Sequence, residues 1–300
     1  MIENTGFPVH IHIVGIGGSA TSGLAMLLQS WGHQVTGSDR DDSRAALFRE
    51  HGIQFFQEDK ESHLPADAKL VIRSRAIEYD HSEIVAANGR GVPTLLYSEA
   101  LGRLSSMKKT IAIAGTHGKT STTGVLTSIF LEAGRDPTVI LGGELESIGG
   151  NWRQGDGEDF IVEACEFQRA FLDLEPRSGI ITNIELDHPD TFDGLPDVEM
   201  TFGHFLDKFH PGSPVVMPAN PDLTDRLVEA GNVRPIYFGA GEGDGWRGKI
   251  SHSTGVRTIE LSKDGVFQFA AEMVIPGTPA ILNTTAAVAL AVALGIEFEA

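Results

Sequence analysis

The sequence is poor in cysteine and in basic residues, and it contains no long apolar run. Its single cysteine, Cys165, excludes an internal disulfide and a cysteine-rich zinc site. The 23 Lys and Arg residues are outnumbered by 41 Asp and Glu residues, and the formal net charge of −18 excludes a broad basic face for nucleic acid. No apolar run reaches the ~18 residues that a membrane-spanning helix needs. Any anionic ligand must therefore be held locally, by backbone N–H groups, one lysine or a metal ion.

The N-terminal segment MIENTGFPVHIHIVGIGG lacks the basic start of a signal peptide, and its apolar stretch ends in glycines that are typical of a turn. Hydrophobic residues make up 41% of the chain and charged residues 21%, which is the composition of an ordinary globular protein. We expect a cytoplasmic protein, and 300 residues are enough for two domains.

Short β-branched runs alternate with helical patterns, which predicts βαβ units and parallel sheets. Strands are expected at 10–16, 34–39, 69–74, 93–98, 110–115, 138–143, 159–164, 179–184 and 214–219. Helices are expected at 21–32, 43–52, 81–90, 118–133, 197–209 and 282–296.

The polar segment RLSSMKK at 103–109 separates two such series and marks a domain boundary. We expect an α/β protein with a Rossmann-like parallel-sheet domain over 1–104 and a central P-loop ATPase-like α/β domain over 105–300. The stretch VRTIELSKDGVFQFAAEMV alternates around Asp264-Gly265, which predicts a small antiparallel hairpin added to the central domain.

A first glycine turn, GIGGSA at 15–20, follows the first expected strand and precedes a helix. It fits the G-x-G-x-x-[GA] pattern, in which glycines let the backbone approach a diphosphate and the helix N-terminus offers free N–H groups. Asp39, at the end of the next strand, would accept a hydrogen bond from a ribose hydroxyl. NAD is the first candidate ligand for this motif alone, and a tight strand–helix turn with a solvated Asp39 is the alternative.

A second glycine turn, GTHGKT at 115–120, is shorter than the common P-loop. The pattern G-x-x-x-x-G-K-[ST] would place its first glycine at position 113, where the chain has Ile113. Lys119 can reach the β- and γ-phosphates of ATP, and the Thr120 hydroxyl can hold Mg²⁺. Helix capping by these residues is the alternative, and His117 can equally face water.

Acids follow the next expected strand of the central domain. Glu163 lies at the carboxyl end of that strand, where ligands bind in open α/β sheets, and we predict that it binds the metal rather than only facing solvent. Glu166 is interpreted as a solvated residue or a helix cap, and Cys165 as a small buried hydrophobe.

The strand at 179–184 leads into the loop TNIELDHPDTF, in which His188 stands between Asp187 and Asp190. We expect this strand to neighbour the one that ends at Glu163, so that the loop contacts a metal or phosphate. An ordinary turn is the alternative, because Pro189 favours one.

In combination these motifs resemble the Mur ligases, the ATP-dependent ligases of peptidoglycan synthesis. The resemblance covers essentially the whole chain and rests on GTHGKTST, on HIVGIGGSATSGLA with GSD at 37–39, on the SRAI–DHSEI segment at 74–84, and on EACEFQRAFLDLEPRSGIITNIELDHPDTF. It implies that the first domain holds the uridine diphosphate of UDP-N-acetylmuramate rather than NAD. The implied residues are Gly15, Gly17, Gly18, Ser19 and Asp39.

The resemblance also implies ATP and Mg²⁺ in the central domain. The implied ATP-binding residues are Gly115, Thr116, His117, Gly118, Lys119, Thr120, Ser121 and Asn283. The implied metal ligands are Thr120, Glu163 and His188, and the implied catalytic residues are Lys119, Glu163 and His188. Asn183 is a weaker candidate for a substrate or nucleotide contact.

The implied reaction is an ADP-forming ligation. The muramyl carboxylate attacks the γ-phosphate to give an acyl phosphate, and the amine of L-alanine then displaces phosphate. One alternative is the recycling ligase that joins a murein tripeptide to the same sugar, and another is a non-catalytic nucleotide-sugar-binding relative. An NAD oxidoreductase would explain the first glycine turn and nothing after residue 110.

Two departures from the family stand out. The family's G-x-H-N-x-x-N-x-x-A-A segment beside adenine retains Gly277 and Asn283, but Pro279 and Ala280 replace the histidine and the first asparagine; Asn283 alone could simply cap the last helix. The family's amino-acid-binding C-terminal domain, of ~100–200 residues, is absent before Ala300. We therefore expect either a fragment or a naturally short relative that does not complete amide synthesis alone.

Overall fold

The computed structural model describes residues 6–58, 60–220, 222–224, 227, 232–253, 256–272 and 277–298. Residues 1–5 of the N-terminal segment and 273–274 of the expected hairpin lie outside the described residues. The chain divides into two compact units, residues 1–107 with 139–154 and residues 108–138 with 155–300. None of the helices in the described part combines the length and apolarity needed to cross a bilayer.

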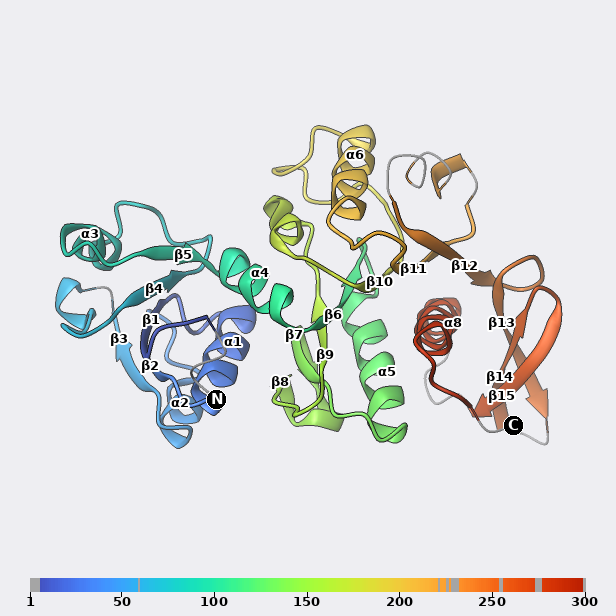
Figure 1. Cartoon of the computed structure of the whole chain (residues 1–300), viewed down its shortest axis with the longest axis horizontal. Coiled ribbons are helices and arrows are strands. Elements are labelled where there is room, and N and C mark those ends of the chain that lie inside the picture. Colours follow the sequence, from blue (N-terminus) through green and yellow to red (C-terminus); the bar gives the residue numbers. More distant parts are fainter. Residues whose placement is uncertain are drawn as a thin grey trace. The chain divides into compact units, whose positions relative to one another are not determined.

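The first unit contains a five-stranded parallel sheet in the order β3-β2-β1-β4-β5 (Figure 1). The strands are β1 (His10–Val14), β2 (Gln34–Asp39), β3 (Gln54–Gln57), β4 (Leu70–Arg73) and β5 (Thr94–Leu96). The chain builds outward from β1 to β3 and then crosses to β4 on the other side of β1. This reversal creates a switch point at the carboxyl ends of β1 and β4, where open α/β sheets bind ligands.

Four α-helices accompany this sheet: α1 (Ser19–Ser30), α2 (Ala45–Glu50), α3 (Ser82–Gly89) and α4 (Tyr97–Met107), with a 3₁₀ turn η2 (Glu61–His63). The segment 103–107, read from the sequence as a polar connector, continues α4. Its Leu104 and Ser105 are buried, which explains why a segment with few apolar residues is helical. β3 and α4 are elements that the sequence patterns did not predict, and the last two residues of the strand expected at 93–98, Tyr97 and Ser98, belong to α4.

A hairpin from later in the chain completes the first unit. It consists of β7 (Thr138–Leu145), the 3₁₀ turn η3 (Glu146–Ile148) and β8 (Gly150–Arg153). The Asn151 amide donates to the Ser19 carbonyl and, at 3.3 Å, to the Ser22 hydroxyl, while the Ser19 hydroxyl donates to the Gly142 carbonyl. The hairpin therefore fixes the N-terminus of α1.

A buried polar network joins three elements of the first unit. His12 in β1 lies 2.5 Å from Glu83 Oε2 through Nε2 and 2.8 Å from the Thr36 hydroxyl through Nδ1. The Ser38 hydroxyl of β2 donates to Glu83 Oε1 at 2.7 Å. Both His12 and Glu83 have no exposed surface. Burial lowers the pKa of His12, and the hydrogen bond and charge of Glu83 offset part of this effect.

We expect Glu83→Ala to lower the free energy of unfolding by about 3 kcal/mol, because it leaves buried polar groups of His12 and Ser38 without their acceptor. Urea unfolding, followed by circular dichroism, measures the loss. The exposed Glu50→Ala is the matched control and should change stability by less than about 0.5 kcal/mol. Equal losses in the two variants would contradict the importance of the network.

The second unit contains a mixed sheet whose strands run in the order β15-β14-β13-β12-β11-β10-β6-β9. Their bounds are β6 (Lys109–Ala114), β9 (Asp159–Glu163), β10 (Ser178–Ile181), β11 (Pro214–Pro218), β12 (Arg234–Ala240), β13 (Trp246–Ser253), β14 (Val256–Lys263) and β15 (Val266–Glu272). Neighbouring strands are parallel from β9 through β6, β10, β11 and β12 to β13. The pairs β13–β14 and β14–β15 are antiparallel. The expected α/β class with an antiparallel addition is confirmed.

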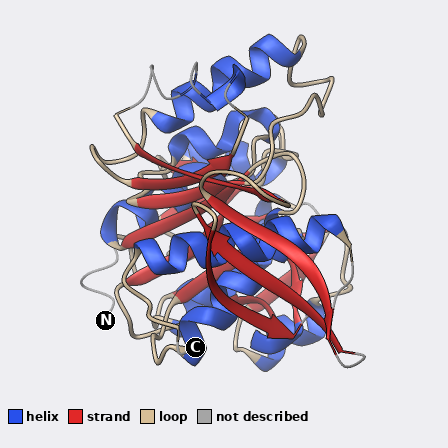
Figure 2. Ribbon diagram, turned by 90° about the vertical axis from the view of Figure 1, so that its right-hand side faces the viewer, coloured by secondary structure: helices blue, strands red, loops and turns tan. Residues whose placement is uncertain are grey.

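Three helices of the second unit have both ends within the described residues, α5 (Lys119–Glu132), α6 (Leu195–Leu206) and α8 (Thr278–Ala293), and the irregular 3₁₀ segment η4 (Phe167–Asp173) accompanies them. Figure 2 shows the antiparallel strands β13–β15 in front. The turn between β14 and β15 has positive φ at both Asp264 (50°) and Gly265 (77°), as a two-residue hairpin turn requires. α8 packs against α5, β12 and β13, so it connects the parallel and antiparallel parts of the unit.

Candidate active site and substrate pocket

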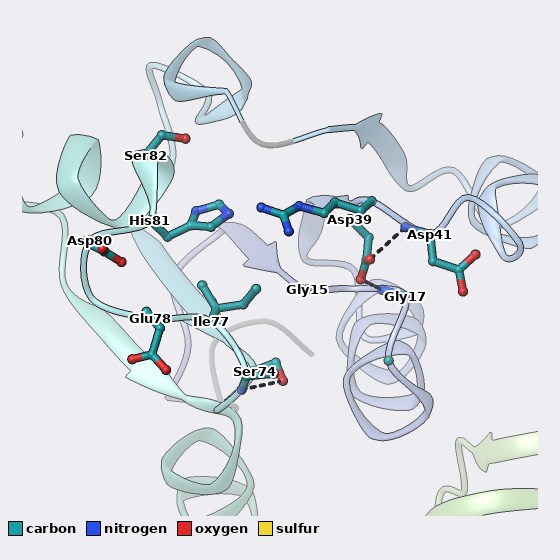
Figure 3. Close-up of a pocket in the computed structure, with 13 residues that line it drawn as sticks. Gly15, Gly17, Asp39, Asp41, Ser74, Ile77, Glu78, Asp80, His81 and Ser82 are labelled. Atoms are coloured by element: carbon teal, nitrogen blue, oxygen red, sulfur yellow. Dashed lines mark hydrogen bonds between the residues drawn. The ribbon is translucent and has the colours of Figure 1, made fainter.

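The first unit has a pocket of about 750 Å³ at the carboxyl ends of its strands (Figure 3). Gly15, Gly17 and Gly18 line it after β1, Asp39 lines it as the last residue of β2, and Asp41 lines it just after β2. The other lining residues are Arg40, which follows β2, and residues from the end of β4 to the first residue of α3: Ser74, Ala76, Ile77, Glu78, Asp80, His81 and Ser82. The pocket therefore lies at the switch point, as the glycine motif predicts.

Asp39 organises the backbone of this pocket. Its Oδ2 accepts from Gly17 N–H at 2.8 Å, and its Oδ1 accepts from Asp41 N–H at 3.0 Å (Figure 3). A Cβ on Gly17 would lie 2.9 Å from Asp39 Oδ2, so only glycine allows this approach. The Asp39 carboxylate, which was expected to accept a hydrogen bond from a ribose, already accepts two backbone hydrogen bonds. Its oxygens have further lone pairs that can accept from a ligand.

Ser19 differs from the other residues predicted for this pocket. It is not among the residues that line the pocket, and its hydroxyl donates to the Gly142 carbonyl of β7. Arg44, which no pattern singled out, donates from Nη1 to the Gly17 carbonyl at 2.6 Å. Arg44 therefore places a positive charge behind the glycine turn.

The second glycine turn joins β6 to α5 in the second unit. Gly115 (φ 132°) and Gly118 (φ 81°) adopt backbone conformations that other residues rarely adopt. Gly118 is the N-cap of α5, and no side chain caps this helix in the described structure. His117 and Ser121 are exposed, and Thr120 is half-buried. The helix N-terminus can therefore offer its first N–H groups to an anion.

The segment after β10 holds this turn in place. Asn183 Oδ1 accepts from His117 N–H at 2.9 Å, and its Nδ2 donates to the His117 carbonyl at 3.0 Å. The Thr182 hydroxyl donates to the same carbonyl at 2.6 Å. The strand expected over 179–184 ends at Ile181, since the next residues form this anchor. Asn183 thus shapes the turn from outside it.

Lys119 is paired with Glu166, an acid that the sequence reading assigned to solvent. Lys119 Nζ lies 2.9 Å from Glu166 Oε2 and 3.1 Å from Oε1. The Glu166 side chain is only 2% exposed and that of Lys119 16%. The interpretation of Glu166 as a solvated residue is wrong; Glu166 does stand at the N-cap position of η4 (Phe167–Asp173), but its side chain makes no capping hydrogen bond there.

The predicted metal ligands come from elements on both sides of β6. Glu163 is the last residue of β9, Thr120 lies in the first turn of α5, and His188 follows β10. The expectation that β9 and β10 are neighbours is wrong, since the sheet order places β6 between them. Both still end beside the glycine turn. In the described residues, no three His, Cys, Asp or Glu side chains converge as a metal cluster.

His188 has a left-handed backbone conformation, and its side chain lies close to Glu166, the residue that pairs with Lys119. Its φ is 54°, and its Nε2 lies 3.7 Å from Glu166 Oε1. The His188 N–H donates to Asp187 Oδ1 at 2.7 Å and lowers the pKa of that carboxyl, and the charges of His188, His117 and Lys119 act in the same direction. The structure therefore brings Lys119, Glu166 and His188 together.

Asn283 lies in α8, and its side-chain amide adjoins the second glycine turn. A Cβ on Gly118 would lie 2.7 Å from Asn283 Oδ1, so the amide directly adjoins this glycine. The neighbouring Pro279 and Ala280 occupy the first turn of α8. Asn283 is beyond the first turn, so its side chain serves the glycine turn rather than capping α8.

Cys165 is exposed, so its interpretation as a small buried hydrophobe is wrong. Enough protein surrounds the sulfur for desolvation to raise the pKa of the thiol, and the charges of Glu166 and Glu163 raise it further. A raised thiol pKa disfavours the nucleophilic thiolate.

A doubly wound unit with a glycine-lined pocket and a second α/β unit with a lysine-bearing glycine turn define an α/β protein of two units, each with a glycine turn between a strand and a helix. Residues 10–109 match the Mur ligase family, catalytic domain, and residues 113–291 match the Mur ligase middle domain. The chain belongs to the Mur ligase family.

Two similar curated proteins carry the same name. The chain is 36% identical to UDP-N-acetylmuramate–L-alanine ligase of Solidesulfovibrio magneticus, over 95% of this chain and 63% of the relative. It is 34% identical to the ligase of the same name from Lachnoclostridium phytofermentans, over 96% of this chain and 64% of the relative. The chain thus spans less than two thirds of the length of these relatives.

Solved structures have the same fold. The UDP-N-acetylmuramate–alanine ligase of Thermotoga maritima is 30% identical with a TM-score of 0.81, covering 95% of this chain and 65% of that chain. The UDP-N-acetylmuramate:L-alanyl-γ-D-glutamyl-meso-diaminopimelate ligase of Neisseria meningitides has a TM-score of 0.88 at 22% identity, covering 97% of this chain and 95% of that chain. At that identity the second likeness concerns the fold alone.

Proposed function

We propose that the protein uses ATP to join L-alanine to UDP-N-acetylmuramate, with release of ADP and phosphate. The observation that carries this proposal is the abbreviated glycine turn with Lys119, set in a chain that is 36% identical to a relative named for this reaction. The murein-tripeptide ligase and the non-catalytic nucleotide-sugar-binding relative remain as outcomes of the tests below.

The second glycine turn supports ATP as the nucleotide. Gly115 and Gly118 lack the Cβ atoms that would clash with Thr182 and Asn283. The resulting open backbone at the start of α5 suits a phosphate chain, and Lys119 supplies the positive charge. For ATP binding we propose the residues of this turn and one residue of α8: Gly115, Thr116, His117, Gly118, Lys119, Thr120, Ser121 and Asn283.

Thr120, Glu163 and His188 are the residues that we propose for magnesium. Hydroxyl and carboxylate oxygens are the donors that Mg²⁺ prefers, so Thr120 and Glu163 fit its chemistry better than the His188 imidazole does. When bound, the ion would neutralise charge on the triphosphate. Because no cluster of these side chains is preassembled in the described residues, substrate oxygens would have to complete the coordination.

The pocket of the first unit supports the UDP part of the substrate. Its volume of about 750 Å³ suits a nucleotide sugar, and its glycine turn can donate N–H groups to a diphosphate. We propose Gly15, Gly17, Gly18 and Asp39 for this contact. We assign Ser19 an indirect part through the start of α1, because its hydroxyl is directed to Gly142.

The chemistry requires positioning and charge neutralisation more than covalent help from the protein. In the proposed reaction the muramyl carboxylate attacks the γ-phosphorus, the bond to the β-phosphate oxygen breaks, and ADP leaves. The amine then attacks the acyl carbon, loses a proton and expels phosphate. Lys119 would hold the γ-phosphate and stabilise the charge that develops on it.

We expect UDP-N-acetylmuramate and MgATP each to raise the melting temperature of this chain, because each binds only the folded protein. At a ligand concentration of about 100 times Kd the gain is about 2.7 kcal/mol. Differential scanning fluorimetry measures it, with NADH as the control ligand. Stabilisation by NADH and by neither of the other two would overturn the proposed function.

The amine is identified by phosphate release from the protein that contains this chain. Release that depends on L-alanine supports the proposed reaction, whereas release that depends on the murein tripeptide indicates the recycling ligase. Binding of both nucleotides with no release for either amine indicates the non-catalytic relative.

A further inference from the structure

Glu166 occupies the position at which Lys119 would meet a phosphate. A lysine ammonium has three N–H donors. The acceptors of Lys119 are the Gly115 carbonyl at 2.5 Å, the Thr116 carbonyl at 3.1 Å and the Glu166 carboxylate at 2.9 and 3.1 Å. All three donors therefore have acceptors within the protein, and only the carboxylate among these acceptors carries a negative charge.

Two carbonyls belong to the glycine turn itself and move with Lys119. The carboxylate comes from a different strand connection, the segment that follows β9. A phosphate that binds Lys119 must take a donor from one of these acceptors, and the carboxylate, which carries a full negative charge, repels the phosphate more strongly than the carbonyl dipoles do. We therefore expect that a phosphate competes with Glu166 for the Lys119 ammonium.

The Glu166 segment is held firmly in place. Nη2 of Arg169 donates to both carboxylate oxygens of Asp197 in α6, at 2.8 and 2.9 Å, and Nη1 donates to the Thr201 hydroxyl at 3.0 Å. Gln168 and Arg169 both have positive φ, 49° and 58°. A backbone strained in this way persists only where the surroundings impose it. The contacts around Glu166 therefore keep its carboxylate at Lys119 rather than letting it swing into solvent.

The burial of this pair strengthens its effect. The Glu166 side chain is 2% exposed, so solvent screens its charge poorly. A buried carboxylate beside a triphosphate raises the free energy of the complex unless a cation lies between them. A divalent cation bound with the nucleotide supplies that cation, whereas nucleotide without metal leaves the repulsion in place.

We propose that Glu166 is an internal competitor for Lys119, which weakens the binding of metal-free nucleotide and makes the site selective for the nucleotide–Mg²⁺ complex. This inference rests on the nucleotide-binding function proposed above. The apparent association constant for the nucleotide equals the intrinsic constant multiplied by the fraction of molecules in which Lys119 is free of the Glu166 carboxylate.

Glu166→Gln tests the inference because it keeps the shape of the side chain and removes its charge. Isothermal titration calorimetry with ATP in EDTA should give a Kd about tenfold lower than that of the wild type. With excess Mg²⁺ the two proteins should differ by less than about threefold, since the metal already offsets the charge. Glu166→Ala should also lower the Kd for ATP in EDTA, and it provides the test if the Glu166→Gln variant does not fold.

Glu185→Gln is the matched control. The Glu185 backbone hydrogen-bonds to the Thr116 side chain of the same turn, and its own side chain is exposed. The substitution removes one negative charge close to the site without touching Lys119. We expect its Kd for ATP in EDTA to stay within about twofold of the wild type, because solvent screens an exposed charge.

The outcomes separate the inference from the function on which it rests. A wild type that binds ATP neither with Mg²⁺ nor without it overturns the proposed function. A wild type that binds MgATP, together with a Glu166→Gln variant that gains no affinity in EDTA, overturns the internal competitor. A variant that instead loses affinity only with Mg²⁺ makes Glu166 a metal ligand and also overturns it.

Discussion

Replacement of Lys119 by alanine is expected to abolish the stabilisation of the protein by ATP. The ammonium is the charged donor of the second glycine turn, and charge-assisted hydrogen bonds to phosphate are about twice as strong as neutral ones. We expect affinity for MgATP to fall by at least about 100-fold, which removes the gain of about 2.7 kcal/mol that saturating ligand gives the wild type. Differential scanning fluorimetry across an ATP titration measures this loss.

Two controls make the Lys119→Ala result specific. The response to UDP-N-acetylmuramate should persist, because its proposed pocket is lined by residues of the first unit. Lys208→Ala removes the same charge from an exposed position just after α6 and should leave the ATP response intact. An Lys119→Ala protein with a normal ATP response would refute the role of the turn.

Gly115→Ala is expected to cost about 3 kcal/mol of stability and to abolish ATP binding. Gly115 has φ 132°, and a Cβ at this position would clash with the Thr182 hydroxyl and approach Asn183 N and O at 3.0 Å. Thr182 and Asn183 anchor the turn through the His117 backbone. The added methyl group would therefore displace the anchor together with the turn. Urea unfolding and calorimetry measure the two effects.

Gly134→Ala separates backbone strain from the clash. Gly134 also has positive φ, 70°, but a Cβ there meets nothing within 4 Å. The substitution should cost only the conformational strain of about 1 kcal/mol and leave ATP binding unchanged. If the two substitutions lowered the free energy of unfolding equally, the contact between Thr182 and Gly115 would not contribute to the cost of Gly115→Ala.

Local patterns predicted the parts of the fold that depend on local chemistry. Both glycine turns, the hairpin at Asp264-Gly265 and most strands follow from residues adjacent in sequence, since positive φ and β-branched runs are local demands. β3 was missed because Gln54–Gln57 is short and has polar residues at both ends. The whole of α4 was missed, because Tyr97 and Ser98 were assigned to a strand and 103–109 to a polar connector, and the local pattern does not show that Leu104 and Ser105 are buried.

The site was predicted less completely, for reasons that lie in the topology. Lys119 and His188 were recognised by type and position, but the order of strands across a sheet is not encoded in any one strand. The placement of β6 between β9 and β10 was therefore expected wrongly. Glu166 looked like a surface acid because nothing near it in sequence reveals that left-handed residues at 168 and 169 turn the chain back towards Lys119.

Because the hairpin at 139–154 belongs to the first unit, this unit cannot be completed when residues 1–107 alone have been synthesised. When the ribosome has released residues 1–107, the start of α1 still lacks Asn151, and the Ser19 hydroxyl still lacks its acceptor on β7. The glycine-lined pocket adjoins this helix start. The nascent chain must therefore extend past residue 151 before the start of α1 has these hydrogen-bond partners, by which point residues 115–120 of the second glycine turn have also been synthesised.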